Sequence, residues 1–358
     1  MEPNKNTSVF LRDRKSILLG DVCSIKTGKR NNQDKDDNGL YPFFVRSSVV
    51  EKINTYSFDG EAILMPGEGN IGDIIHYING KFDFHQRVYK ISNFDNDLCG
   101  KYVFYALQKS FKKWALKNTV KATVDSLRLP TFQSFSFYAP KKEYQEKIVQ
   151  MLDAVVNHIS NIEKLIAKQE SIKKTTVKLL LTSKPHWTEY KIKEKFKVTR
   201  GLVLSTNQMS KSQNGVFQYP VYSSQTQNNG LIGFYNNFLY QDAITWTTDG
   251  ANAGFVRFRP GKFYCTNVCG VLLSDEGYAN TCVATMLGNV SKKYVSYVGN
   301  PKLMNNVMAE IPLLFPSVQE QQYISDKIQK LDQQLEHLRS ELDKYRNIKK
   351  GLMDYFFG

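Results

Sequence analysis

The sequence predicts an α+β chain in which two β-rich domains of one fold alternate with two long amphipathic helices. Two observations lead to this prediction. A long helical segment occurs twice, at residues 140–182 and 316–358, and the copies align without a gap. The segments that precede them, residues 1–139 and 183–315, share a more broken likeness and contain short strand-like runs. The predicted order is therefore domain, helix, domain, helix, with these boundaries.

The two helical segments carry the clearest pattern. They align at a constant offset of 176 residues, which places Pro140 on Pro316. Their apolar residues recur at spacings of four and three, which is typical of a coiled-coil seam. Forty residues of helix span about 60 Å. The alternative is two separate surface helices, each packed on its own domain. The predicted seam consists of Ile148, Leu152, Val155, Ile159, Ile162, Ile166, Ile324, Ile328, Leu331, Leu335, Leu338 and Leu342.

The first domain reads as short strands separated by Gly-, Asn- and Asp-containing turns, which indicates a mainly β fold. One helix is expected within it, over residues 100–116, where aromatic and aliphatic residues supply an apolar side. The predicted strands are residues 24–28, 41–45, 62–65, 73–78 and 82–91.

The second domain mirrors the first, with offsets that shift where loops differ in length. Residues 25–28 match 198–201, the Tyr-Pro pair at 41–42 matches the pair at 219–220, and residues 62–63 match 243–244. Two domains of one fold whose loops have drifted apart are expected to recognise different things. Two helices that share the same apolar stripe are expected to pack against equivalent surfaces.

The charge points to nucleic acid. The formal net charge is +14. Residues 1–139 hold 20 Lys and Arg against 15 Asp and Glu, and residues 183–315 hold 13 against 7. Basic domains favour the phosphate backbone, although charge that only aids solubility is the alternative. The chain lacks a long apolar run and a signal-peptide pattern, and its five cysteines are irregularly spaced, so a cytoplasmic location is expected.

No constellation for catalysis is evident in the sequence. Residues 67–72 match a GxGxxG pattern, but a strand-like run follows where a dinucleotide site needs a helix. Cys265 and Cys269 have no matching histidine pair for zinc. We therefore expect no catalytic residues, no metal and no cofactor in this chain.

The whole chain resembles the specificity (S) subunit of Type I restriction–modification systems. The resemblance rests on the alternation of β-rich domains and long helices, and on the opening run of residues 19–28. It also rests on the helix openings at 143–148 and 320–324, and on the tail at 349–357. No single piece is decisive, whereas their order and duplication together are specific.

The resemblance implies a function for each part. Each globular region is expected to be a target recognition domain that reads one half of a two-part site on double-stranded DNA. The long helices are expected to pair antiparallel, to set the spacing of the half-sites, and to dock two modification (methyltransferase) subunits. Those subunits carry S-adenosylmethionine, and restriction/translocase subunits join them for cleavage.

Loop residues that differ between the copies are the candidate DNA readers. Arg suits guanine, and Asn or Gln suits adenine. The candidates in the first domain are Lys29, Arg30, Asn31, Asn32, Arg46, Ser47, His85, Gln86, Arg87, Lys121 and Thr123. Those in the second domain are Arg200, Ser205, Thr206, Tyr222, Ser223, Asn252, Thr266, Asn267 and Lys302.

Two other readings remain open at this point. The chain could be the recognition subunit of another restriction–modification class with the same architecture. It could also be a coiled-coil adaptor whose β domains bind proteins.

Overall fold

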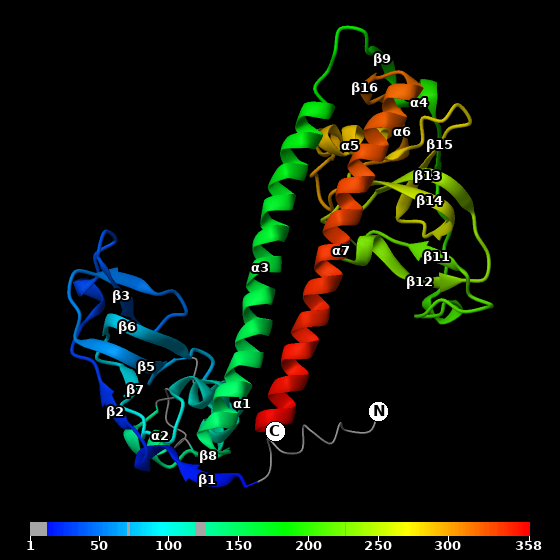
Figure 1. Cartoon of the computed structure of the whole chain (residues 1–358). Coiled ribbons are helices and arrows are strands. Elements are labelled where there is room, and N and C mark those ends of the chain that lie inside the picture. The colour runs from blue at the N-terminus through cyan, green and yellow to red at the C-terminus, as the bar shows by residue number, and fades with distance from the viewer. Residues whose placement is uncertain (1–12, 70–71, 119–126, 226) are drawn as a thin grey trace. The chain divides into compact units, whose positions relative to one another are not determined.

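The structure, a computed structural model, describes residues 13–69, 72–118, 127–225 and 227–358 (Figure 1). It divides into two compact units. The first unit contains residues 1–163 together with 340–358, and the second contains residues 164–339. Two long helices, α3 (Lys142–Leu180) and α7 (Val318–Phe357), therefore contribute one end to each unit.

The first unit is built on a six-stranded sheet in the order β2-β7-β5-β6-β3-β4. All its pairings are antiparallel except β3 with β6. A separate pair, β1 with β8, closes the domain next to the long helix. Its elements are β1 (Lys15–Leu18), β2 (Ser24–Thr27), β3 (Tyr41–Phe44), β4 (Glu51–Ile53), β5 (Phe58–Pro66), β6 (His76–Phe84), β7 (Val88–Ser92), α1 (Gly100–Asn118), α2 (Leu129–Gln133) and β8 (Ser136–Ala139).

The second unit repeats this plan. Its six-stranded sheet has the order β10-β15-β13-β14-β11-β12, and β11 with β14 is the parallel pair. Its elements are β9 (Thr188–Lys191), α4 (Ile192–Lys195), β10 (Lys197–Arg200), β11 (Tyr219–Tyr222), β12 (Leu231–Tyr235), β13 (Tyr240–Thr247), β14 (Val256–Cys265), β15 (Cys269–Leu273), α5 (Thr281–Val290), α6 (Asn305–Glu310) and β16 (Pro312–Phe315). Matching strand order in both units confirms the predicted α+β fold of two domains of one kind.

The sequence prediction misplaced one strand boundary. It expected two separate strands at 73–78 and 82–91, so that the Asn79-Gly80 pair lay between them. Instead β6 runs through this pair, and the turn comes later, at residues 85–87. Gly80 lies opposite Gly60 of β5, and both have φ near +140°. The strand therefore passes a glycine without ending, because glycine adopts backbone conformations closed to other residues.

A buried glutamine joins each long helix to its own domain. Gln145 donates to the carbonyl of Pro140 (2.8 Å) and accepts from the backbone N–H of Cys99 (3.0 Å). Gln321, at the matching position, donates to the carbonyl of Pro316 (2.9 Å) and accepts from Asn280 (2.8 Å). Both side chains are almost fully buried. Both prolines lie just outside the helices, where a residue without an N–H is tolerated.

The two helices lie antiparallel within each unit. In the second unit Glu170 of α3 pairs with Arg339 of α7 (2.7 Å), and Lys173 pairs with Asp332, nearer the start of α7. Gln169 also donates to Gln334 across the pair (2.7 Å). In the first unit the ring of His158 lies 4.1 Å from that of Tyr345. Polar pairs thus join the helices at Gln169 and Lys173, beyond Ile166, the last predicted apolar seam residue of α3.

The twelve predicted seam residues are all buried or half-buried. Ile148 and Leu152 belong to the core of the first domain, and Ile324 and Ile328 to that of the second. The start of each helix is therefore part of a globular core, and the core of the first domain also contains Met353 and Phe356 from the end of α7. None of the helices in the described residues is long and apolar enough to span a membrane.

Replacing Gln145 by Leu should lower the free energy of unfolding of the first unit by about 1–3 kcal/mol, because a buried N–H and a buried carbonyl lose their partner. Chemical denaturation would measure the loss of stability, and hydrogen exchange of the backbone amides of α1 would show that the first unit is affected. Gln150→Leu is the matched control, since Gln150 is exposed on the same helix and its replacement should change stability by less than about 0.5 kcal/mol. Equal effects would contradict the role of Gln145.

Candidate nucleic-acid interface

The candidate residues of the first domain gather at one end of its sheet. They follow β2, follow β3, or lie in the turn between β6 and β7. Gln86 donates its backbone N–H to the carbonyl of Arg30 (2.8 Å) and its side-chain amide to Asn31 (2.5 Å). A shallow cleft is lined by Asn32, Arg46 and Ser47 together. The structure thus brings nine candidates together, while Lys121 and Thr123 lie outside the described residues.

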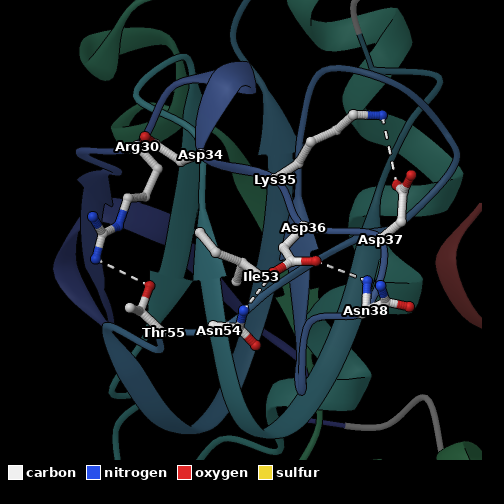
Figure 2. Close-up of a pocket in the computed structure, with 9 residues that line it drawn as sticks. All are labelled: Arg30, Asp34, Lys35, Asp36, Asp37, Asn38, Ile53, Asn54 and Thr55. Atoms are coloured by element: carbon white, nitrogen blue, oxygen red, sulfur yellow. Dashed lines mark hydrogen bonds and ion pairs between the residues drawn. The ribbon is translucent and has the colours of Figure 1, made fainter.

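Arg30 is held at the centre of this cluster. Its Nε lies 3.2 Å from Oδ2 of Asp83, and its terminal nitrogen donates to Thr55 (3.0 Å). Asp83 is only 1% exposed and also accepts from Thr55 (3.0 Å) and Ser57 (2.8 Å). Figure 2 shows Arg30 and Thr55 on one side of a cleft of about 550 Å³, with Lys35 and Asp37 on the other. The guanidinium is therefore positioned before any ligand arrives.

The other cations of this cluster are loosely held. Arg46 and Arg87 share one carboxylate, Glu68, at 3.5 and 2.6 Å, and both guanidinium groups are about half exposed. Such surface ion pairs contribute less than about 1 kcal/mol. Phosphate oxygens can therefore replace Glu68 at little cost.

His85 has a structural role in the turn. It is buried, and its Nδ1 accepts the backbone N–H of Arg87 (2.9 Å). Burial lowers the pKa of His85, and the nearby charges of Arg46 and Arg87 lower it further. The ring is therefore neutral at pH 7 and holds the turn rather than a phosphate.

The second domain presents its candidates at the matching end of its sheet, but several are used internally. Thr266 donates its hydroxyl to Ser223 (3.0 Å) and its backbone N–H to Tyr222. Arg200 donates to the carbonyl of Asn267, and also to Thr248 and Asp249 (2.9 Å each). The candidates that remain exposed are Ser205, Thr206, Asn252, Asn267 and Lys302.

Two exposed residues of this end were missed from the sequence. Leu202 and Val203 directly follow Gly201, with exposed fractions of 56% and 78%. They occupy the positions that Lys29 and Arg30 occupy after Gly28. The internal repeat that matches residues 25–28 with 198–201 continues for two more residues, and this continuation is the sequence signal that points to Leu202 and Val203.

Each domain also buries one cation against aromatic rings. Lys90 lies 3.3 Å from the ring centre of Phe58, and Arg259 lies 3.8 Å from that of Tyr222. Burial lowers the pKa of Lys90 to about 8, with a smaller contribution from Lys26.

No group of three or more His, Cys, Asp or Glu side chains in the described part of the chain could hold a metal ion. Cys265 and Cys269 are buried thiols in the core beneath this end of the sheet. Burial raises the pKa of Cys269 to about 11, so its thiol stays protonated. These two cysteines pack as small apolar residues.

Comparison with known proteins gives consistent likenesses. A family model described as the Type I restriction modification DNA specificity domain matches residues 12–173 and again residues 185–343. The N-terminal part of a putative type I specificity subunit from Mycoplasma pneumoniae is 43% identical over 140 residues, which are 38% of this chain and 73% of that one. A second subunit of that kind from the same organism is 36% identical over 169 residues, 46% of each chain.

The fold has a counterpart among solved structures. The crystal structure of a Type I restriction–modification S subunit from M. genitalium superposes with a TM-score of 0.77, over 100% of this chain and 98% of that one. The sequence identity is 17%, so this likeness concerns the fold.

The buried Lys90 predicts a pH dependence. The unfolded chain holds this proton up to a pKa near 10.5, whereas the folded chain releases it near 8. The unfolded state therefore binds more protons between these values, and stability rises with pH across that window. Lys90→Met should be more stable than the wild type at pH 7, and its advantage should shrink as pH rises from 8 to 10.

Denaturation midpoints at several pH values would measure this difference. Lys52→Met is the control, because Lys52 is exposed and its replacement should give a difference that does not depend on pH. The matching position in the second domain is Val271, which is fully buried, so an apolar side chain fits there. An advantage of Lys90→Met that is constant from pH 7 to 10 would contradict the assignment.

Proposed function

The chain belongs to the family of Type I restriction–modification DNA specificity subunits, and from this premise we propose that it reads a two-part sequence on double-stranded DNA. One domain reads each half of the site. The observation that carries the proposal is the repeated topology: candidate readers gather at the same end of two sheets with the same strand order, on loops that differ.

Affinity in this proposal comes mainly from phosphates and specificity from bases. Exposed cations such as Lys29, Arg46, Arg87 and Lys302 serve the phosphates. The release of counterions makes such binding weaken steeply with salt.

The long helices set the distance between the half-sites. Each has about 40 residues, which gives a length of about 60 Å. One turn of DNA is about 34 Å, so a stiff helical pair is long enough to fix a spacing on that scale. We assign to the same helices the docking of two modification (methyltransferase) subunits, one for each repeat.

Catalysis belongs to the partners in this proposal. The modification subunits bind S-adenosylmethionine and transfer its methyl group, and restriction/translocase subunits add cleavage in the full complex. This chain supplies no catalytic residue and no cofactor. The complex works in the cytoplasm, where chromosomal DNA is accessible.

Selection from a random duplex library tests the proposal. The chain is assembled with the modification subunits of its own host, and the duplexes that this complex binds are recovered from the library and sequenced. We expect two short defined blocks separated by a spacer of fixed length, and a linear fall of log affinity with log salt concentration. Enrichment of a single continuous block, or equal binding to all duplexes, would rule out a two-part reader. Equal binding would instead favour the protein-binding adaptor.

Subunit docking gives a second test. Ile162→Asp places a charge at a position that is 3% exposed on α3, which costs several kcal/mol without a partner. We expect the variant to lose assembly with modification subunits, measured by the mass of the complex in solution. Leu165→Asp is the matched control, since Leu165 is 51% exposed on the same helix, and it should assemble normally. If both variants assemble normally, the docking of modification subunits does not depend on the pairing of the two helices.

A further inference from the structure

Two turns leave the two sheets at matched points. Gly28 follows β2 and donates to the carbonyl of Val88 (3.3 Å), and Gly201 follows β10 and donates to the carbonyl of Cys269 (3.0 Å). A Cβ on Gly28 would lie 2.0 Å from the carbonyl oxygen of Phe84. A Cβ on Gly201 would lie 2.3 Å from that of Cys265, the residue that matches Phe84.

Only glycine therefore permits either close approach, because any side chain would collide with backbone. The two residues after each glycine consequently start from equivalent places in the two domains. In the first domain they are Lys29 and Arg30, and in the second they are Leu202 and Val203. The two domains thus present opposite chemistry at one structural position.

Arg30 fits a guanine. Its Nε and one N–H of a terminal nitrogen are committed to Asp83 and Thr55. The outer edge, formed by the two terminal nitrogens, has no further partner among the residues that the structure describes, and the side chain is 40% exposed. An arginine edge of two donors matches the O6 and N7 acceptors of guanine in the major groove. A guanidinium already fixed by a buried carboxylate loses little freedom when it binds.

The surroundings of Arg30 favour a base over a phosphate. Asp34, Asp36 and Asp37 line the same cleft, together with Lys35 (Figure 2). The excess of carboxylates around the cleft repels a phosphate group, whereas the edge of a guanine–cytosine pair carries an amino donor on the cytosine that a carboxylate can accept. Arg30 is therefore placed to read a base rather than to anchor the backbone.

Leu202 and Val203 fit a thymine. Both are exposed, and neither side chain can form a hydrogen bond. The nearest arginine in the chain, Arg200, is turned back onto Asn267, Thr248 and Asp249. The apolar group that a base pair offers in the major groove is the C5-methyl of thymine.

We propose that the turn after Gly28 reads a guanine through Arg30, and that the matched turn after Gly201 reads a thymine methyl through Leu202 and Val203. The two half-sites therefore differ in base at the position that these turns reach. This inference rests on the proposed function and adds to it the residues that distinguish the two half-sites.

Modified duplexes test the inference with the unchanged protein in its complex with modification subunits. Replacing the guanine by 7-deazaguanine removes N7, and replacing the thymine by uracil removes only the methyl group. We expect each change at one position of its own block to weaken binding at least about fivefold, since base contacts discriminate by about that factor or more. Unchanged affinity for both modified duplexes at every position would overturn the inference.

Exchanged turns identify the residues. The double variant Lys29→Leu, Arg30→Val should lose the guanine preference in one block and keep the other block. The double variant Leu202→Lys, Val203→Arg should change the base preference in the other block and leave the first block unchanged. Far-UV circular dichroism and thermal unfolding check that each variant folds. If the wild type enriches a two-part sequence and neither exchange alters it, this inference fails while the proposed function stands. If the wild type enriches no such sequence, the proposed function itself fails.

Discussion

Each long helix starts in one hydrophobic core and ends in the other, and the rest of the structure depends on this constraint. Ile148 and Leu152 of α3 lie in the core of the first domain together with Met353 and Phe356 from the far end of α7. Val177 and Leu180 at the end of α3, and Leu181 directly after it, pack against the core of the second domain. Neither domain completes its core with its own segment alone, so each depends on a helix end that is distant in the sequence.

The buried glutamines make this arrangement specific. Hydrophobic contacts alone are tolerant of rotation about the helix axis, whereas a buried amide with fixed partners is not. Gln145 and Gln321 each join the first turn of a helix to the preceding proline and to the adjacent domain. Their matching positions indicate that the duplicated unit included the joint as well as the helix. A helix anchored in this way is suited to hold a recognition domain at a fixed orientation.

The ends of the two sheets that carry the candidate DNA readers show how one topology supports two chemistries. In the first domain, ion pairs dominate: Arg30 with Asp83, and Arg46 and Arg87 with Glu68. In the second, Arg200 is held by internal hydrogen bonds, and the apolar side chains of Leu202 and Val203 are exposed after the matched glycine. Because exposed ion pairs such as those of Arg46 and Arg87 with Glu68 contribute little to stability, these residues can change between copies without loss of the fold. The strand order and the glycines beneath the turns are constrained instead by backbone geometry.

The sequence by itself determined the alternation of domains and helices, because a heptad stripe and an internal repeat are local patterns. It also located the loops that carry the candidate readers. Tertiary structure decided which of these residues are available: His85 and Arg200 are committed internally, and Leu202 and Val203 are exposed. It likewise decided that Ile148 and Ile324 pack in the globular cores of the two domains. A spacing pattern reports which face of a helix is buried but not what covers it, since the covering residues come from elsewhere in the chain.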